Sequence, residues 1–286
     1  MRSVRMVLAA AAVMALGGAA QAAVLVQDDF NSATYTEGGS IVKSGANALP
    51  VNPNSQWGAI GAVGGSWTAA AAAAAESPFT ATPGGRGAVV TDNSITYGAS
   101  GAIQSPTFTA QTGHVYASFD YKPMSVGTND NRIAFQTSGF RSDGVTASSG
   151  AVVNLICSTA VAPTTFSSLT GMYFGYTDNQ NRNIGLQAIT YDTWYQVTID
   201  ADLTGTYPFT TLTITPFGGT TTAFDPVIFN QINQKRINQI TVGNMTGPTQ
   251  EGGYAIDNIT VSNSVPEPAS LSLLGVGGLM MLRRRR

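Results

Sequence analysis

The sequence predicts an all-β protein in which two antiparallel sheets pack face to face. Several segments alternate apolar and polar residues with a period of two, which is typical of half-buried strands. The 286 residues include 32 glycines and only 10% charged residues, and Gly-rich turns separate the alternating segments. Apolar residues make up 43% of the chain, which is enough to bury a core.

The alternating segments supply roughly a dozen short strands. In the clearest one, Val115, Ala117, Phe119 and Tyr121 share one face. The other expected strands cover residues 24–30, 87–91, 103–108, 132–137, 151–157, 172–177, 184–190, 195–203, 211–215, 237–242 and 254–262. Because the apolar sides of such strands must meet, the pattern indicates a jelly-roll sandwich.

Two further features bear on this body. An alanine-rich run covers residues 69–75. Alanine favours helix, but an isolated stretch this short is marginal in water, so we expect a surface loop or one or two helical turns. The single cysteine, Cys157, excludes an intrachain disulfide and is expected to be a small buried hydrophobe.

Residues 1–22 have the three parts of a secretory signal peptide. Arg2 and Arg5 precede an apolar stretch, and Ala20 and Ala22 occupy the small-residue positions of a cleavage site. The apolar stretch is too short to span a membrane. We therefore expect export and cleavage after Ala22, which leaves residues 23–262 as one β-sandwich domain.

Residues 263–286 form a second terminal segment. Pro266, Glu267 and Pro268 are followed by an apolar run and then by the four arginines Arg283, Arg284, Arg285 and Arg286. The run is shorter than the ~20 residues of an ordinary spanning helix, which predicts a short membrane helix. The arginines are expected to stay on the cytoplasmic side, with the body outside.

These three parts, in this order, resemble the PEP-CTERM sorting signal of Gram-negative bacteria that make exopolysaccharide. The resemblance implies the export machinery and an exosortase-type processing enzyme as partners. It also implies a transient stay at the inner membrane, followed by delivery to the cell envelope or the extracellular matrix.

The charge of the body excludes one class of partner. The terminal segments hold six of the 14 Lys and Arg but one of the 16 Asp and Glu, so the body has a net charge near −7. It carries no basic patch, and nucleic acid is not an expected partner.

The strand pattern of the body also resembles the concanavalin-A-like lectin and glucanase sandwiches, including laminin-G-like domains. The segments that carry the resemblance are 119–123, 192–200 and 254–261. A galactose-binding-like jelly roll remains an alternative. The resemblance implies a body that binds carbohydrate.

Two acidic residues suggest a structural calcium site. Asp28 shares its parity with Val26 and Phe30, and Asp257 shares its parity with Ile259 and Val261, so both carboxylates are expected on the core side. The first and last strands of a jelly roll are often neighbours. We therefore hypothesise that Asp28 and Asp257 meet and help to bind Ca²⁺. The alternative is that each carboxylate accepts backbone N–H bonds at a strand end or bulge.

The three tryptophans are candidates for stacking on sugar rings. Trp57, Trp67 and Trp194 are accompanied by ten tyrosines, and Trp194 falls on the polar parity of its strand. The alternative is that the tryptophans cover a sheet edge or pin long loops. The polar runs 128–131 and 178–183 could also line a ligand or calcium site, or form solvated turns.

Signals for catalysis are weak. The only histidine, His114, begins a strand, and no G-x-S-x-G elbow accompanies it. The body's glutamates, Glu37, Glu76 and Glu251, are far apart in loop-like stretches. The sequence thus predicts a non-enzymatic surface protein that binds exopolysaccharide or another surface glycan. The alternatives are a structural or adhesive protein and, third, a carbohydrate-active hydrolase or lyase.

Overall fold

A computed structural model of the chain shows that residues Val24–Asn263 form one compact unit. The residues that the structure describes are 23–43, 49–50, 52–61, 67–80, 85–92, 101–124, 130–137, 150–158, 172–177, 183–205, 209–228, 236–244 and 252–263. The predicted signal peptide and sorting tail lie outside these ranges. Within them, no helix has both the length and the apolar character needed to cross a membrane.

The described residues form fifteen strands and one short 3₁₀ helix. The strands are β1 (Val24–Asp28), β2 (Gly58–Gly61), β3 (Trp67–Ala72), β4 (Gly87–Asp92), β5 (Gly101–Gln104), β6 (His114–Met124), β7 (Asp130–Thr137), β8 (Gly150–Ser158), β9 (Met172–Thr177), β10 (Asn183–Ile189), β11 (Tyr195–Asp202), β12 (Phe209–Pro216), β13 (Thr222–Ile228), β14 (Gln239–Asn244) and β15 (Gly252–Ser262). The helix, η1, covers Ala73–Ala75.

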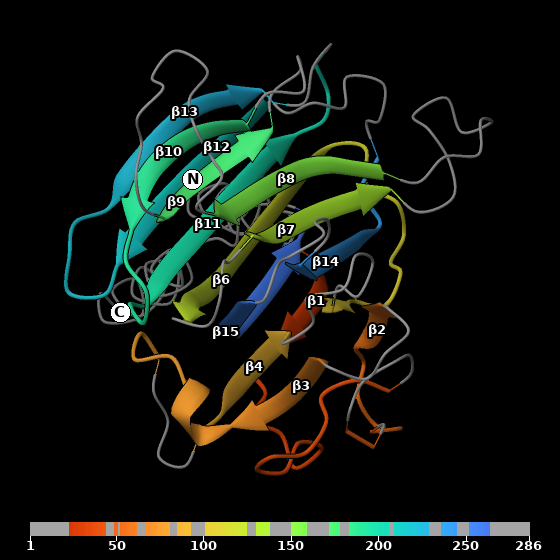
Figure 1. Cartoon of the computed structure of the whole chain (residues 1–286). Coiled ribbons are helices and arrows are strands. Elements are labelled where there is room, and N and C mark those ends of the chain that lie inside the picture. Colours follow the sequence, from red (N-terminus) through yellow and green to blue (C-terminus); the bar gives the residue numbers. More distant parts are fainter. Residues whose placement is uncertain are drawn as a thin grey trace, which may run out of the picture. The chain divides into compact units, whose positions relative to one another are not determined.

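The strands make two antiparallel sheets, which confirms the prediction of an all-β protein with two such sheets (Figure 1). The eight-stranded sheet has the order β13-β12-β11-β6-β15-β4-β3, with β1 also paired to β15. The seven-stranded sheet has the order β10-β9-β8-β7-β14-β5-β2. The first and last strands of the body are therefore neighbours, as predicted.

One edge of β15 is shared by two strands. β4 pairs with its first half, ending at the pair Ile256–Ala88, and β1 pairs with its second half, beginning at the pair Ile259–Asp28. Between them lies a β-bulge, where the pairing of β15 with β6 shifts register between Asp257 and Thr260. The end of β1 and the start of β4 consequently meet at this bulge.

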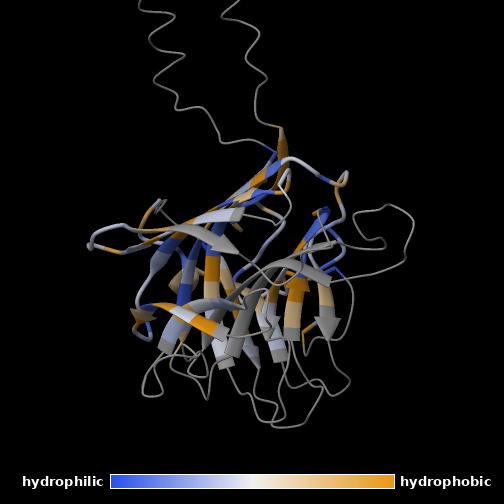
Figure 2. Ribbon diagram, turned by 90° about the horizontal axis from the view of Figure 1, so that it is seen from above, coloured by the Kyte–Doolittle hydropathy of each residue, from blue (hydrophilic) through white to orange (hydrophobic). Residues whose placement is uncertain are grey.

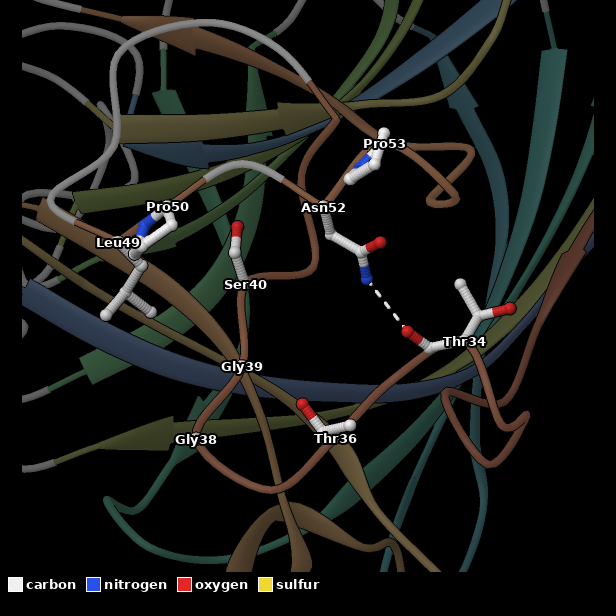
Figure 3. Close-up of a pocket in the computed structure, with 9 residues that line it drawn as sticks. All are labelled: Thr34, Thr36, Gly38, Gly39, Ser40, Leu49, Pro50, Asn52 and Pro53. Carbon is white, nitrogen blue, oxygen red and sulfur yellow. Dashed lines mark hydrogen bonds between the residues drawn. The ribbon is translucent and has the colours of Figure 1, made fainter.

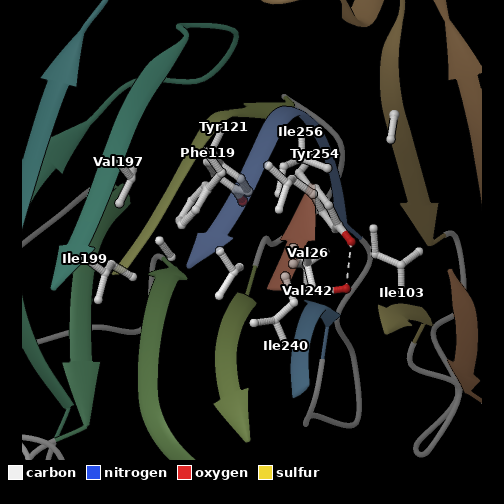
Figure 4. Close-up of a cluster of buried hydrophobic side chains, with 14 of the residues drawn as sticks. Val26, Ile103, Phe119, Tyr121, Val197, Ile199, Ile240, Val242, Tyr254 and Ile256 are labelled. Carbon is white, nitrogen blue, oxygen red and sulfur yellow. Dashed lines mark hydrogen bonds between the residues drawn. The ribbon is translucent and has the colours of Figure 1, made fainter. Parts of the chain in front are cut away.

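The main core lies between the two sheets. Strand β11 alternates buried and half-buried residues along its whole length, as its sequence predicts, and Figure 2 shows apolar and polar positions mixed along the strands. Tyr121 of β6 packs on Phe174 of β9, with ring centroids 5.7 Å apart. The Tyr254 hydroxyl crosses between the sheets and donates to the Val242 carbonyl at 2.9 Å (Figure 4). This bond satisfies a buried polar group and fixes the spacing of the two layers.

The alanine-rich run forms the predicted helical turn only at its end, and the rest of it is a strand. Its first part belongs to β3 and pairs with β4, and only Ala73–Ala75 is helical. Ala69 and Ala71 are fully buried in the main core. Pairing with a neighbouring strand satisfies backbone groups there, and this outweighs the helical preference of alanine.

A second, smaller apolar cluster lies on the outer face of the eight-stranded sheet. It consists of Ala75, Trp194 and Ala255, with Ala72, Phe79 and Val89 packed against it. The segment 73–80 thus covers part of a sheet face that would otherwise be solvated. Gly87 permits this close approach, because a Cβ there would lie 1.9 Å from the Ala75 carbonyl oxygen.

Candidate functional site

Asp28, at the end of β1, is the centre of a dense polar cluster. The residue is 8% exposed. The Oδ2 atom accepts hydrogen bonds from the Tyr35 hydroxyl at 2.6 Å, from Gln56 Nε2 at 2.8 Å and from Trp57 Nε1 at 2.8 Å. The Oδ1 atom accepts the Phe30 backbone N–H at 2.9 Å. Four donors therefore compensate the burial of this carboxylate.

Aromatic residues pack closely around Asp28. Phe30 stacks on Trp57 with centroids 6.1 Å apart, and its ring lies 5.5 Å from that of Tyr35. Phe30 has a φ of 53°, which is unfavourable for a bulky side chain. Its bond to Asp28 and its complete burial hold it there. Burial and the neighbouring Asp28 raise the pKa of Tyr35 well above its usual value, so the Tyr35 hydroxyl remains a donor.

A polar pocket of about 350 Å³ opens beside this cluster. It is lined by the side of β1 and by the loop that leads from β1 to β2. The lining residues are Gln27, Asp28, Asp29, Ser32, Thr34, Tyr35, Asn54 and Gln56. The volume falls at the lower end of the range for ligand pockets, about 300–1,000 Å³. Amide, hydroxyl and carboxylate groups of this kind suit a ligand rich in hydroxyls.

A second pocket, of about 310 Å³, adjoins the first, because both are lined by Thr34. The Asn52 side-chain amide donates to the Thr34 carbonyl at 2.9 Å and so ties the two parts of the loop together. Figure 3 shows this bond, with Thr36, Ser40 and Pro53 around the same opening. The two pockets therefore lie next to each other along β1 and the loop that follows it.

Asp257 occupies a different place from the one predicted. Asp257 and its neighbour Ala255 face the outer side of the sheet, whereas Tyr254 and Ile256 face the core. Asn258, at a φ of 51°, inserts an extra residue in β15, and Ile259 then returns to the core side. The prediction that Asp257 faces the core on the same side as Ile259 is therefore wrong, because the bulge between them interrupts the alternation of the strand.

The bulge brings two buried carboxylates together. Asp257 lies directly opposite Asp120 of β6, and each is 1% exposed. Asp257 accepts the backbone N–H groups of Ser77 and Asn258, at 2.9 and 2.8 Å. Asp120 accepts the Asn258 side-chain amide at 2.7 Å. Burial raises the pKa of Asp257 to about 7, and the charges of Asp120 and Asp29 add to this rise. Burial also raises the pKa of Asp120.

The structure does not assemble the predicted calcium site. Asp28 bonds to side chains of the main core, whereas Asp257 lies under Ser77 on the outer face, so the two carboxylates are on opposite sides of the sheet. The described part of the chain holds no group of three or more His, Cys, Asp and Glu residues placed to bind a metal. The alternative, that each carboxylate accepts N–H bonds at a strand end or bulge, matches the observed contacts.

Two of the three tryptophans, Trp57 and Trp194, are not the exposed sugar platforms that the sequence suggests. Trp57 is fully buried and donates to Asp28, so it supports the pocket from behind. Trp194 is 8% exposed and belongs to the outer apolar cluster, with Lys122 Nζ 5.2 Å from its ring centroid. The side chain of Trp67, at the start of β3, lies outside the described part of the structure, as does that of Cys157 in β8.

His114 lies on the exposed outer face and contacts two carboxylates. Its Nδ1 atom is 3.1 Å from Asp200 and its Nε2 atom is 3.7 Å from Asp202, both on β11. Of the polar runs 128–131 and 178–183, the structure describes only the backbone of residues 130–131, in β7, and of residue 183, at the start of β10. Patterns in the sequence do not predict the pocket beside Asp28. The one signal for this pocket in the sequence is the consecutive pair Asp28 and Asp29, followed by a loop rich in Ser, Thr and Asn.

No family model matches the chain, and no curated protein matches it. Among solved structures, the chain is similar to a conserved carbohydrate esterase from the Shiga toxin-encoding bacteriophage phi24B, with a TM-score of 0.51 and 14% identity over 85% of this chain and 100% of that one. At this identity the likeness identifies a shared fold. Peanut lectin has a TM-score of 0.42 at 10% identity, over 72% of this chain and 96% of the lectin. The exoplasmic domain of VIP36, bound to Ca²⁺ and Man3GlcNAc, has a TM-score of 0.44 at 9% identity, over 77% of this chain and 87% of that one.

Proposed function

We propose that this chain is an exported, non-catalytic glycan-binding protein, and that its sandwich takes a saccharide in the polar pocket beside Asp28. The observation that carries the proposal is the pocket itself. Its rim consists of hydroxyl, amide and carboxylate groups, and a rigid buried cluster of Asp28, Tyr35 and Trp57 supports it. Preorganised polar groups of this kind bind hydroxyl-rich ligands with little loss of conformational entropy.

The two ends of the chain support the cellular part of the proposal. Residues 1–22 direct export, and the Pro-Glu-Pro motif, apolar run and arginines of residues 263–286 are read by an exosortase-type enzyme at the inner membrane. The body then reaches the cell envelope or the matrix, where polysaccharide is abundant. A concanavalin-A-like subtype of sandwich is consistent with the order of strands in the two sheets.

A glycan array with a matched pair of variants tests the binding site. The double variant Ser32→Ala with Asn54→Ala removes an exposed hydroxyl and an exposed amide that line the pocket. The control, Thr80→Ala with Asn263→Ala, removes the same two kinds of group at exposed positions outside the pocket. We expect the first variant to lose most of its binding and the control to keep it. Equal binding by both variants would place the ligand elsewhere.

The likeness to a carbohydrate esterase favours one alternative, hydrolysis of acylated sugars. An esterase of the serine type needs a histidine within hydrogen-bonding reach of a nucleophile. The His114 ring instead has a carboxylate at each nitrogen, from Asp200 and Asp202. Release of acetate from an acetylated polysaccharide, and its loss in His114→Ala, would establish this alternative.

A further inference from the structure

We infer that the pocket beside Asp28 selects saccharides that carry a free amino group over neutral saccharides, and that it disfavours uronic acids. The inference rests on the proposed function of this pocket and adds the class of sugar that it takes. It follows from the charges and the open hydrogen-bonding atoms of the lining residues.

The pocket is lined by two consecutive carboxylates whose bonded donors are all neutral. Asp28 accepts hydrogen bonds from a phenol hydroxyl, a side-chain amide, an indole N–H and a backbone N–H. Asp29 Oδ1 accepts the Asn31 backbone N–H at 3.1 Å, and Asp29 is exposed. Neutral donors stabilise a carboxylate but do not cancel its charge. The residues that line the pocket include no Lys or Arg, so its potential is negative.

One basic side chain that contacts the part of this loop near the pocket, Arg86, is already paired. Arg86 donates to the Tyr35 carbonyl at 3.4 Å, and its Nε atom lies 3.6 Å from Glu37 Oε2. Glu37 therefore compensates the Arg86 charge locally. A carboxylated sugar in the pocket would face two like charges, and no lining residue offers it a cation.

Besides hydroxyl and amide groups that can donate or accept, the pocket lining offers a ligand two groups that only accept. Gln56 uses its amide N–H groups on the Gln27 carbonyl, at 2.9 Å, and on Asp28, at 2.8 Å, which leaves its amide oxygen for a ligand. Asp29 adds an exposed carboxylate that can only accept when ionised. A protonated amine brings three donors and a positive charge, so it matches this surface better than a hydroxyl or an N-acetyl group.

Calorimetric titration of the full-length protein with three oligosaccharide probes tests the inference. The probes are oligomers of glucosamine, which carry free amines, of N-acetylglucosamine, which are neutral, and of galacturonic acid, which are anionic. At mildly acidic pH and low salt, we expect the glucosamine oligomer to bind about fivefold more tightly than the neutral one, because a partly exposed ion pair contributes about 1 kcal/mol. Added salt should reduce this preference.

Two variants at one position separate charge from shape. Asp29→Asn keeps the acceptor for the Asn31 N–H but removes the exposed one of the two charges, so it should lose most of the preference for the amine probe. Asp29→Lys should improve binding of the galacturonate oligomer. The control Asp192→Asn removes a charge at an exposed residue outside the pocket and should keep the amine preference.

The outcomes distinguish this inference from the proposed function. If the neutral oligomer binds as tightly as the amine oligomer, or if Asp29→Asn keeps the full amine preference, the selectivity for amino sugars is overturned while glycan binding stands. If none of the three probes binds, the proposed glycan function of the pocket fails.

Discussion

Replacing Asp257 by asparagine should change how the stability of the protein depends on pH. The folded pKa of this buried carboxyl is about 7, against an ordinary value of 3.8. The folded state therefore holds the Asp257 proton more tightly than the unfolded state. By linkage, the group's contribution to stability is full below about pH 4, falls as the pH rises and is lost by about pH 7. The interval spans about three pH units, which corresponds to a loss of up to about 4 kcal/mol.

The asparagine variant should not lose stability over this pH interval, but at every pH it should lack a smaller, constant part of the free energy of unfolding. Asp257 accepts N–H groups from Ser77 and Asn258 through its two oxygens, and asparagine offers one oxygen for the two donors. Leaving one buried donor unpaired costs about 1–3 kcal/mol. We therefore expect Asp257→Asn to be less stable than the wild type near pH 4 and more stable near pH 8, with the two curves crossing between these values.

Urea unfolding at a series of pH values measures this effect directly. The free energies of unfolding of the wild type, Asp257→Asn and the control Asp192→Asn are compared, with m-values checked for constancy. Because Asp192 is exposed, its variant should follow the wild-type curve. If the Asp257→Asn curve stays parallel to that of the wild type from acid to alkaline pH, the raised pKa of Asp257 is wrong.

Three further predictions follow from single contacts. Trp57→Phe removes one of four donors to Asp28 and should lower the free energy of unfolding by about 1.5–3 kcal/mol, measured in urea. Gly87→Ala places a Cβ against a backbone oxygen and should cost about 3 kcal/mol or more, whereas Gly113→Ala, with open space around the new Cβ, should change stability by less than about 1 kcal/mol. Because hydrogen bonds from protein groups already occupy the carboxylate oxygens of Asp28, the melting temperature of the wild type should be the same in excess chelator and in calcium. A marked rise of the melting temperature with calcium would support the metal hypothesis again.

Much of the fold can be predicted from local patterns in the sequence. The strands around Val115–Tyr121 and Tyr195–Ala201 have unbroken alternation, and the structure places their apolar residues in the core. The predicted pairing of the first and last strands is confirmed as well. The strand formed by the alanine-rich run cannot be predicted in this way, because its conformation depends on a partner strand, β4, that lies outside any local window.

The site is harder to predict, because it depends on one local irregularity and on long-range contacts. The bulge at Asn258 reverses the parity of Asp257, and no proline or glycine in the sequence marks it. Trp57 donates to a carboxylate 29 residues earlier in the chain, so its role follows from the tertiary fold. Sequence patterning identifies Asp28 as a core-facing carboxylate in need of partners, but it cannot name them.

The central claim is that a saccharide binds in the pocket between β1 and the loop that follows it. The most direct test is a nuclear magnetic resonance titration of the isotope-labelled protein with the oligosaccharide that binds best. We predict that shifts of backbone amides concentrate at residues 27–36 and 52–57. Shifts that concentrate instead on the outer face around Trp194 and Phe217, or no shifts at all at saturating ligand, would contradict the claim.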